Sequence, residues 1–248
     1  MKFERPYFTG NLFFGVQAEK FGAALMALVS TIKSNRGVFY SDNLITWSKS
    51  LGWIDDVEFV TAMNRHAKTT VEKGIVWRTA TLAWAARQAL RVPGDFVECG
   101  CYKGTTARIL CDVVDLSSRK FYLYDLFEGA EGISNHAMPE HGPELFEGVT
   151  ARFAEMPNVI VTKGRVPESF SQAAPQSISL LHIDMNNVTA EIAALEALFD
   201  KVSPGGIIIL DDYGWIGYVD QQRAERAWFA ERGYAVLERP TGQGLVIK

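Results

Sequence analysis

The sequence has few cysteines and few histidines, and neither set is spaced as a cross-link or a zinc site requires. The three cysteines include Cys99 and Cys101, which a single residue separates. This spacing provides neither a disulfide framework nor a Cys-x-x-Cys pair, so we expect the cysteines to be small core residues. The four histidines form no His-x-x-x-His or His-Glu-x-x-His pair and are expected to be structural or solvated.

Positive charge and long apolar runs are also scarce. The formal net charge is −4, and the sequence has no basic run, which argues against a nucleic-acid partner. The most apolar early segment, residues 22–29, is too short to span a bilayer and follows charged residues, so it resembles neither a signal peptide nor a membrane helix. We therefore expect a cytoplasmic protein without a nucleic-acid or membrane partner.

The composition is typical of a globular protein with one large domain and an extension. The hydrophobic fraction is 48% and the charged fraction 22% over 248 residues, which allows a sizeable core. Apolar residues at helical spacing predict helices over residues 18–33, 42–67 and 71–90, without a catalytic arrangement. Residues 1–92 are therefore predicted to form a helical N-terminal extension that packs on the core or on the partner in a homo-oligomer.

From residue 93 onward, strand-like apolar runs alternate with helical ones. Strands are predicted at residues 95–98, 121–124, 159–162, 178–183 and 206–210. Helices are predicted at residues 105–111, 190–199 and 220–232, with a final hairpin of residues 234–239 and 244–247. Near-continuous Ile, Val and Leu runs that alternate with helices favour a parallel sheet covered on both faces. We therefore assign residues 93–248 to one α/β domain.

The segment of residues 95–104 is predicted to be a buried strand that ends in a glycine turn. Glu98 ends the strand, and Gly100 and Gly104 flank the loop that opens the next helix. Glycines let a backbone approach a ligand closely. The pattern is Glu-x-Gly-x-x-x-Gly, not the Gly-x-Gly-x-x-Gly of a dinucleotide pyrophosphate site. A carboxylate at the strand end suits a ligand with a cationic amino acid moiety, and a purely structural turn is the alternative.

Carboxylates follow several predicted strands, and in open α/β sheets ligands bind beyond the carboxyl ends of the strands. Asp125 ends the second strand about 20 residues after the glycine loop, where such folds hydrogen-bond a ribose diol. The alternative for Asp125 is a helix N-cap. Asp184, Asp211 and Asp212 end two strands expected to be neighbours, and converging like charges repel unless a cation lies between them. Ligation by oxygen alone points to Mg²⁺ or a similar hard ion. The alternative to a metal site is that Asp211 caps the following turn and Asp212 is solvated.

Taken together, these motifs resemble the macrocin O-methyltransferase family. They are Gly-Asp-Phe-Val-Glu-Cys-Gly at residues 94–100, Asp-Leu-Phe-Glu-Gly at 125–129, Leu-His-Ile-Asp at 181–184, Ser-Pro-Gly-Gly at 203–206 and Asp-Asp-Tyr-Gly at 211–214. Enzymes of this family methylate sugar hydroxyls with S-adenosylmethionine and Mg²⁺. The resemblance implies a Rossmann-like class I methyltransferase fold, with a mostly parallel seven-stranded sheet and helices on both faces. It also implies a small sugar or glycoside as the substrate.

The resemblance further implies roles for individual residues. The implied cofactor-binding set is Glu98, Gly100, Tyr102, Gly104, Thr105, Asp125 and Gly164. The implied ligands of Mg²⁺ are Asp184, Asp211 and Asp212.

One catalytic position departs from the family. There, the aspartate corresponding to Asp184 begins an Asp-x-Asp pair whose second member takes the proton from the sugar hydroxyl, but here Asn186 stands in that place. An amide cannot accept a proton as a carboxylate does, and a positioned base contributes about 10²- to 10⁴-fold to the rate. One explanation is that metal coordination acidifies the substrate hydroxyl, and that water or a histidine of a lid over residues 129–146 takes the proton. Asn186 would then orient the substrate. The alternatives are a non-catalytic or altered cofactor-binding protein on the same fold and an NAD-dependent oxidoreductase, which the glycine pattern disfavours.

Overall fold

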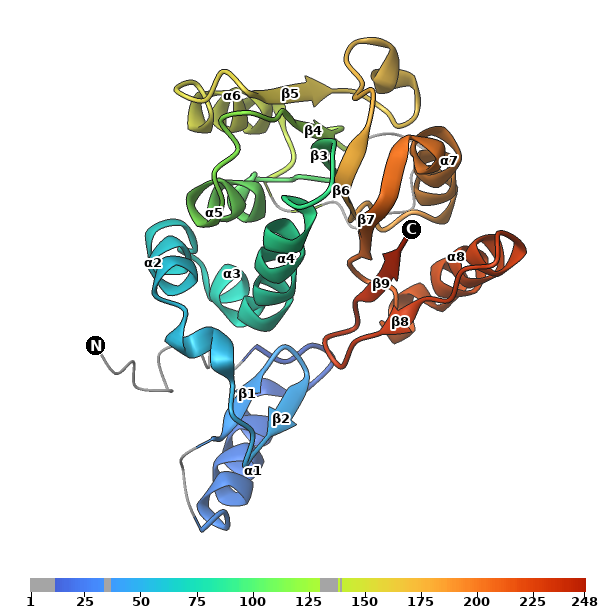
Figure 1. Cartoon of the computed structure of the whole chain (residues 1–248). Helices are drawn as coiled ribbons and strands as arrows, with labels where there is room; N and C mark the ends of the chain where they lie inside the picture. The colour runs from blue at the N-terminus through green and yellow to red at the C-terminus, as the bar shows by residue number, and fades with distance from the viewer. Residues whose placement is uncertain (1–11, 34–36, 130–137, 139) are drawn as a thin grey trace. The chain divides into compact units, whose positions relative to one another are not determined.

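The structure is a computed structural model, and it describes residues 12–33, 37–129, 138 and 140–248. The chain divides into two compact units, residues 1–81 and 82–248. The division falls inside helix α4 (Val76–Ala89), earlier in the chain than the predicted boundary after residue 92 (Figure 1).

The first unit combines short helices with a hairpin. Its elements are α1 (Ala18–Ser30), β1 (Phe39–Ser41), β2 (Leu44–Thr46), η2 (Gly52–Asp55), α2 (Val57–His66), α3 (Thr70–Gly74) and the beginning of α4. The prediction of a helix over residues 42–67 is wrong at its start, because β1 and β2 pair there as an antiparallel hairpin. Asp42 and Asn43 form the turn with φ angles of 50° and 57°.

Contacts with residues far along the chain stabilise this hairpin. The buried Asp42 carboxylate accepts hydrogen bonds from Nε and Nη2 of Arg78 at 3.0 and 3.1 Å. The neighbouring Ser41 hydroxyl donates to the carbonyl of Gly74 at 3.0 Å. The stabilisation by a bidentate, charge-assisted pair exceeds the few tenths of a kcal/mol by which the helix propensities of most residues differ. Apolar spacing alone therefore predicts the wrong element at this position.

The second unit is built around a seven-stranded sheet with the order β5-β4-β3-β6-β7-β9-β8. The parallel strands are β3 (Asp95–Cys99), β4 (Phe121–Asp125), β5 (Val159–Lys163), β6 (Ile178–Ile183) and β7 (Val202–Leu210). The antiparallel strands β8 (Leu237–Glu238) and β9 (Gly244–Ile247) form the predicted final hairpin. The mostly parallel sheet is thus confirmed. The strand order reverses between β3 and β6, which is where open α/β sheets bind ligands.

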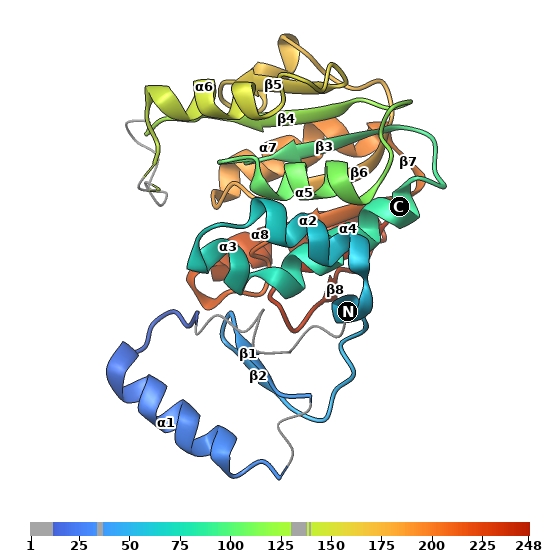
Figure 2. The same ribbon diagram turned by 90° about the vertical axis from the view of Figure 1, so that its left-hand side faces the viewer.

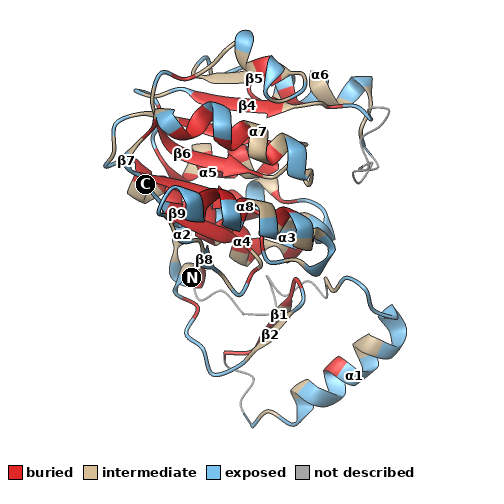
Figure 3. Cartoon of the chain, turned by 90° about the vertical axis from the view of Figure 1, so that its right-hand side faces the viewer, coloured by how far each residue is buried: buried red, intermediate tan, exposed pale blue. Residues whose placement is uncertain are grey.

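Helices cover both faces of this sheet. Helices α5 (Thr105–Val113) and α6 (Pro143–Arg152) lie on one face, and α7 (Val188–Leu198) and α8 (Val219–Glu231) lie on the other (Figures 2 and 3). Short 3-10 helices are η3 (Glu168–Ser171), η4 (Phe199–Lys201) and η5 (Ile216–Tyr218). Every residue of β6 is buried, as its largely apolar sequence predicts. Figure 3 shows the same burial across the central strands.

Helix α6 was not predicted. It begins with Pro143 at the end of the stretch predicted to be a lid, and the rest of that prediction, including His136, falls largely outside the described residues. The cysteines are free, and Cys99 and Cys101 are buried as predicted. Among the described residues, no helix is both long enough and apolar enough to cross a membrane.

Candidate active site

The glycine loop after β3 packs closely against the loop after β6. Gly100 has a φ of 92°, and its N–H donates to the carbonyl of Tyr124 at 2.8 Å. A Cβ atom at Gly100 would lie 1.8 Å from the carbonyl oxygen of Asp184, so only glycine allows this approach. Gly104 caps α5 with a φ of 66°, and a Cβ there would lie 2.8 Å from the Phe153 ring.

Asp125 is held in place by two backbone N–H groups. Its Oδ2 accepts from Tyr102 and its Oδ1 from Phe127, both at 2.7 Å. Burial raises the pKa of Asp125, while the hydrogen bond from Phe127 and the charge of His141 oppose that rise. No described helix begins directly after Asp125, so the N-cap alternative does not hold. The carboxylate is instead fixed beside the glycine loop.

A cavity of about 550 Å³ opens at the carboxyl ends of β3, β4, β5 and β6. Its size falls within the range of about 300–1,000 Å³ that is typical of small-molecule sites. The predicted site residues that line it are Gly100, Tyr102, Asp125, Gly164, Asp184 and Asn186. The predicted site residues that are not among its described lining residues are Glu98, Gly104, Thr105, Asp211 and Asp212. The structure thus brings together most, but not all, of the predicted site.

Glu98, His182 and Asp211 form a buried row across three neighbouring strand ends. They are 3%, 3% and 6% exposed. Nδ1 of His182 is 2.9 Å from Oε1 of Glu98, and Nε2 is 3.5 Å from Oδ1 of Asp211. Oδ1 of Asp211 also accepts a hydrogen bond from Gln243 at 2.8 Å. Burial opposes a charge on His182, but the attraction of Asp211 and Glu98 raises its pKa well above the ordinary value.

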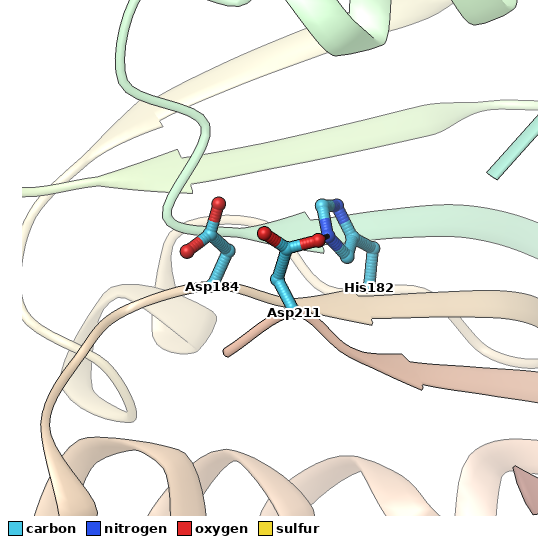
Figure 4. Close-up of side chains that lie close together, drawn as sticks. All are labelled: His182, Asp184 and Asp211. Carbon is cyan, nitrogen blue, oxygen red and sulfur yellow. Dashed lines mark ion pairs between the residues drawn. The ribbon is translucent and has the colours of Figure 1, made fainter. Parts of the chain in front are cut away.

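His182 and Asp211 lie close to Asp184, and together they could hold a metal ion. Within the described residues, one ligand atom from each of the three lies within 4.8 Å of the others (Figure 4). Asp212 is not in this group, and its role as a metal ligand stays a prediction. Sequence reasoning did not identify His182 as a candidate ligand. The available signal was the alternation of side chains, which places residue 182 of β6 and residue 184, one position beyond the end of that strand, on the same side of the sheet.

The loop that carries Asn186 is anchored by a buried carboxylate. Asn186 has a φ of 55°, and its N–H and that of Met185 donate to Oε1 of Glu191 at 2.9 and 3.0 Å. The side-chain Oδ1 of Asn186 is buried without a hydrogen-bond partner. This anchoring fixes the backbone of the loop at the edge of the cavity.

Comparisons with known proteins agree with this geometry. Residues 97–213 match the model of a protein family described as a methyltransferase domain. A curated relative from Streptomyces olivaceus, 8-demethyl-8-(2,3-dimethoxy-alpha-L-rhamnosyl)-tetracenomycin-C 4'-O-methyltransferase, is 29% identical over 140 residues. The match covers 49% of this chain and 54% of the relative, so this chain spans about half the length of the relative it matches.

Two solved structures share the fold. The O-methyltransferase NovP aligns with a TM-score of 0.58 and 20% identity, over 70% of this chain and 80% of its own. An O-methyltransferase from Bacillus cereus, in complex with S-adenosylhomocysteine, aligns with a TM-score of 0.53 and 14% identity, over 91% of this chain and 97% of its own. The second unit therefore has the Rossmann-like fold of class I methyltransferases, and its residues 97–213 are similar to a methyltransferase domain. Membership of the macrocin family stays a prediction.

Proposed function

We propose that this protein is an S-adenosylmethionine-dependent O-methyltransferase that methylates a hydroxyl group of a sugar or glycoside with the help of a divalent cation. The observation that carries the proposal is the cavity where the strand order reverses. Asp125, whose carboxylate is held by two N–H groups, and Asp184 both line this cavity. The methyltransferase-domain match supports methyl transfer. The relative from S. olivaceus supports a sugar acceptor.

The glycine loop and Asp125 would bind the cofactor. Gly100 lets the backbone approach the ligand, and Asp125 accepts hydrogen bonds from the two hydroxyl groups of a ribose diol. The two N–H groups that hold Asp125 orient its carboxylate before the cofactor binds, which reduces the entropy lost on binding. When bound, the cofactor supplies an electrophilic methyl group, which the acceptor oxygen takes up as its hydroxyl proton leaves.

A divalent cation would bind where β6 and β7 end. The fit rests on a buried polar atom, because Nε2 of His182 has no hydrogen-bond partner and lies close to carboxylate oxygens of Asp184 and Asp211. One nitrogen and two carboxylates suit a divalent ion. A cation at this position polarises the acceptor hydroxyl and lowers its pKa.

Asn186 would orient the acceptor without removing its proton. Its backbone is fixed by Glu191, and its amide can donate to or accept from a hydroxyl. His141 lines the same cavity and would be available, with water, to take the proton that the acceptor hydroxyl releases.

A methyl-transfer assay tests the proposal. The full chain is incubated with S-adenosylmethionine labelled at the methyl group, a divalent cation, and a panel of rhamnosides, sugar nucleotides and catechols. We expect the label on a sugar oxygen, with one S-adenosylhomocysteine formed per methyl transferred. Asp125→Ala should raise KM for the cofactor, whereas Asp220→Ala, at an exposed position on α8, should not. Methylation of catechols alone would contradict the sugar assignment, and cofactor binding without transfer to any acceptor would favour a non-catalytic protein.

A further inference from the structure

The two nitrogens of the His182 ring have different surroundings. Nδ1 lies 2.9 Å from Oε1 of Glu98, which is a good hydrogen-bond distance. Nε2 is fully buried without a hydrogen-bond partner. Figure 4 shows this edge of the ring turned toward Asp211, with Asp184 beside it. One ring nitrogen is therefore partnered, and the other faces two carboxylates.

With Nδ1–H donating to Glu98, this arrangement favours a positive charge between Nε2 and the carboxylates. When Nδ1–H donates to Glu98 in a neutral ring, Nε2 carries a lone pair, which an oxygen of Asp211 repels. A proton on Nε2 would relieve the repulsion. Charge-assisted hydrogen bonds are about 2.7–2.9 Å long, but Nε2 is 3.5 Å from Oδ1 of Asp211. That oxygen already accepts a shorter hydrogen bond from Gln243, at 2.8 Å.

A metal ion fits the same spacing better. Bonds from a transition-metal ion to imidazole nitrogen or carboxylate oxygen are about 2.1 Å long. At that length, two ligand atoms 3.5 Å apart subtend about 110° at the metal, which is the tetrahedral angle. The third ligand, Asp184, is only partly buried, and its oxygen lies within 4.8 Å of the other two ligand atoms.

We propose that His182, Asp184 and Asp211 bind one transition-metal dication, with Nε2 of His182 as the nitrogen ligand. Imidazole favours ions such as Co²⁺, Fe²⁺ or Zn²⁺, and Mg²⁺ favours oxygen alone. The site therefore prefers a transition metal over Mg²⁺ and does not use Asp212. This inference deepens the metal part of the proposed function, but it rests on the geometry of the site itself.

Glu98 is the positioning residue of this site. A carboxylate that accepts a hydrogen bond from the far nitrogen of a metal-bound histidine fixes the orientation and tautomer of the ring, and its loss typically lowers metal affinity about 10- to 100-fold. Glu98 holds Nδ1 in this way from the neighbouring strand β3, where it pairs in register with His182.

The test is a titration of chelator-treated, reduced full-length protein with Co²⁺, followed by visible absorption. We expect the wild type to bind one equivalent with d–d bands and an excess of Mg²⁺ not to displace it. His182→Gln should weaken binding at least 10-fold, and Glu98→Gln should weaken it while keeping the bands. Asp212→Asn and the exposed control Asp220→Asn should bind as the wild type does.

Nuclear magnetic resonance of the Co²⁺-loaded wild type provides a readout that needs no variant. A histidine ligand gives a hyperfine-shifted, exchangeable signal from its Nδ1 proton, so this signal is expected even if His182→Gln fails to fold. Three results would overturn the proposal: no d–d bands in the wild type, equal Co²⁺ binding by a folded His182→Gln variant, or binding that Asp212→Asn abolishes and Mg²⁺ displaces. Titration of the same samples with S-adenosylhomocysteine separates a failed metal site from a failed cofactor site.

Discussion

Replacing Glu225 with glutamine should stabilise the protein at alkaline pH, because two buried carboxyl groups share one proton. Glu191 of α7 and Glu225 of α8 are 1% and 0% exposed, and Glu191 also accepts two hydrogen bonds from the Asn186 loop. Burial, followed by the charge of Glu191, raises the pKa of Glu225 to about 11. Burial also raises the pKa of Glu191, with a smaller contribution from Asp211. At neutral pH, Glu225 is therefore the protonated member of the pair.

The sign of the pH dependence follows from this proton. The folded state keeps the proton, whereas the unfolded chain releases it above its ordinary pKa of about 4.3. The free energy of unfolding must then fall with increasing pH until the folded pKa, near 11, is reached. One retained proton costs up to about 1.4 kcal/mol per pH unit, or about 4 kcal/mol between pH 6 and pH 9.

Urea denaturation of the wild type and Glu225→Gln between pH 6 and pH 9 measures this effect. The glutamine amide does not titrate, so the variant should lose less stability with increasing pH and exceed the wild type at pH 9. Glu231→Gln, at an exposed position on the same helix, is the matched control and should follow the wild type. A wild-type stability that does not fall over this range, or a Glu225→Gln variant less stable than the wild type at pH 9, would refute the shared proton.

Further predictions concern the glycine loop and the base position. Gly100→Ala should destabilise the protein by about 3 kcal/mol and abolish binding of S-adenosylhomocysteine, because the added Cβ would overlap the Asp184 carbonyl. Thermal unfolding measures the loss of stability, and calorimetry measures the loss of binding. The control is Gly217→Ala, because the space around Gly217 is open. An unchanged melting temperature would contradict that account. Asn186→Asp places a carboxylate beside the acceptor, so kcat for the sugar acceptor should rise at least about 10-fold. The pH profile of kcat should also show the titration of one additional acidic group. A fall in kcat with unchanged cofactor binding would show instead that the amide itself is required.

Sequence patterns predicted the second unit well because its signals are local. The central strands β3, β4 and β6 are largely buried, so their sequences are mostly apolar, and glycine or aspartate marks where each one ends. Those same endings placed Gly100, Asp125 and Asp184 at one edge of the sheet, where the cavity lies.

The features that the sequence did not predict depend on distant partners. The hairpin at residues 39–46 is stabilised by the pair of Asp42 with Arg78, which apolar spacing cannot reveal. The proposed role of His182 depends on Glu98 and Asp211, which lie on neighbouring strands. In the sequence it stands as a single histidine within an apolar strand, which is more typical of a core residue.

Binding of S-adenosylhomocysteine tests the central claim most directly. Calorimetric titration compares the wild type with Asp125→Ala and with the exposed control Asp220→Ala. We predict one site per chain with micromolar affinity, weakened at least 10-fold in Asp125→Ala and unchanged in Asp220→Ala. Absence of binding by the folded wild type, or equal binding by Asp125→Ala, would contradict the assignment of this cavity to the methyl donor.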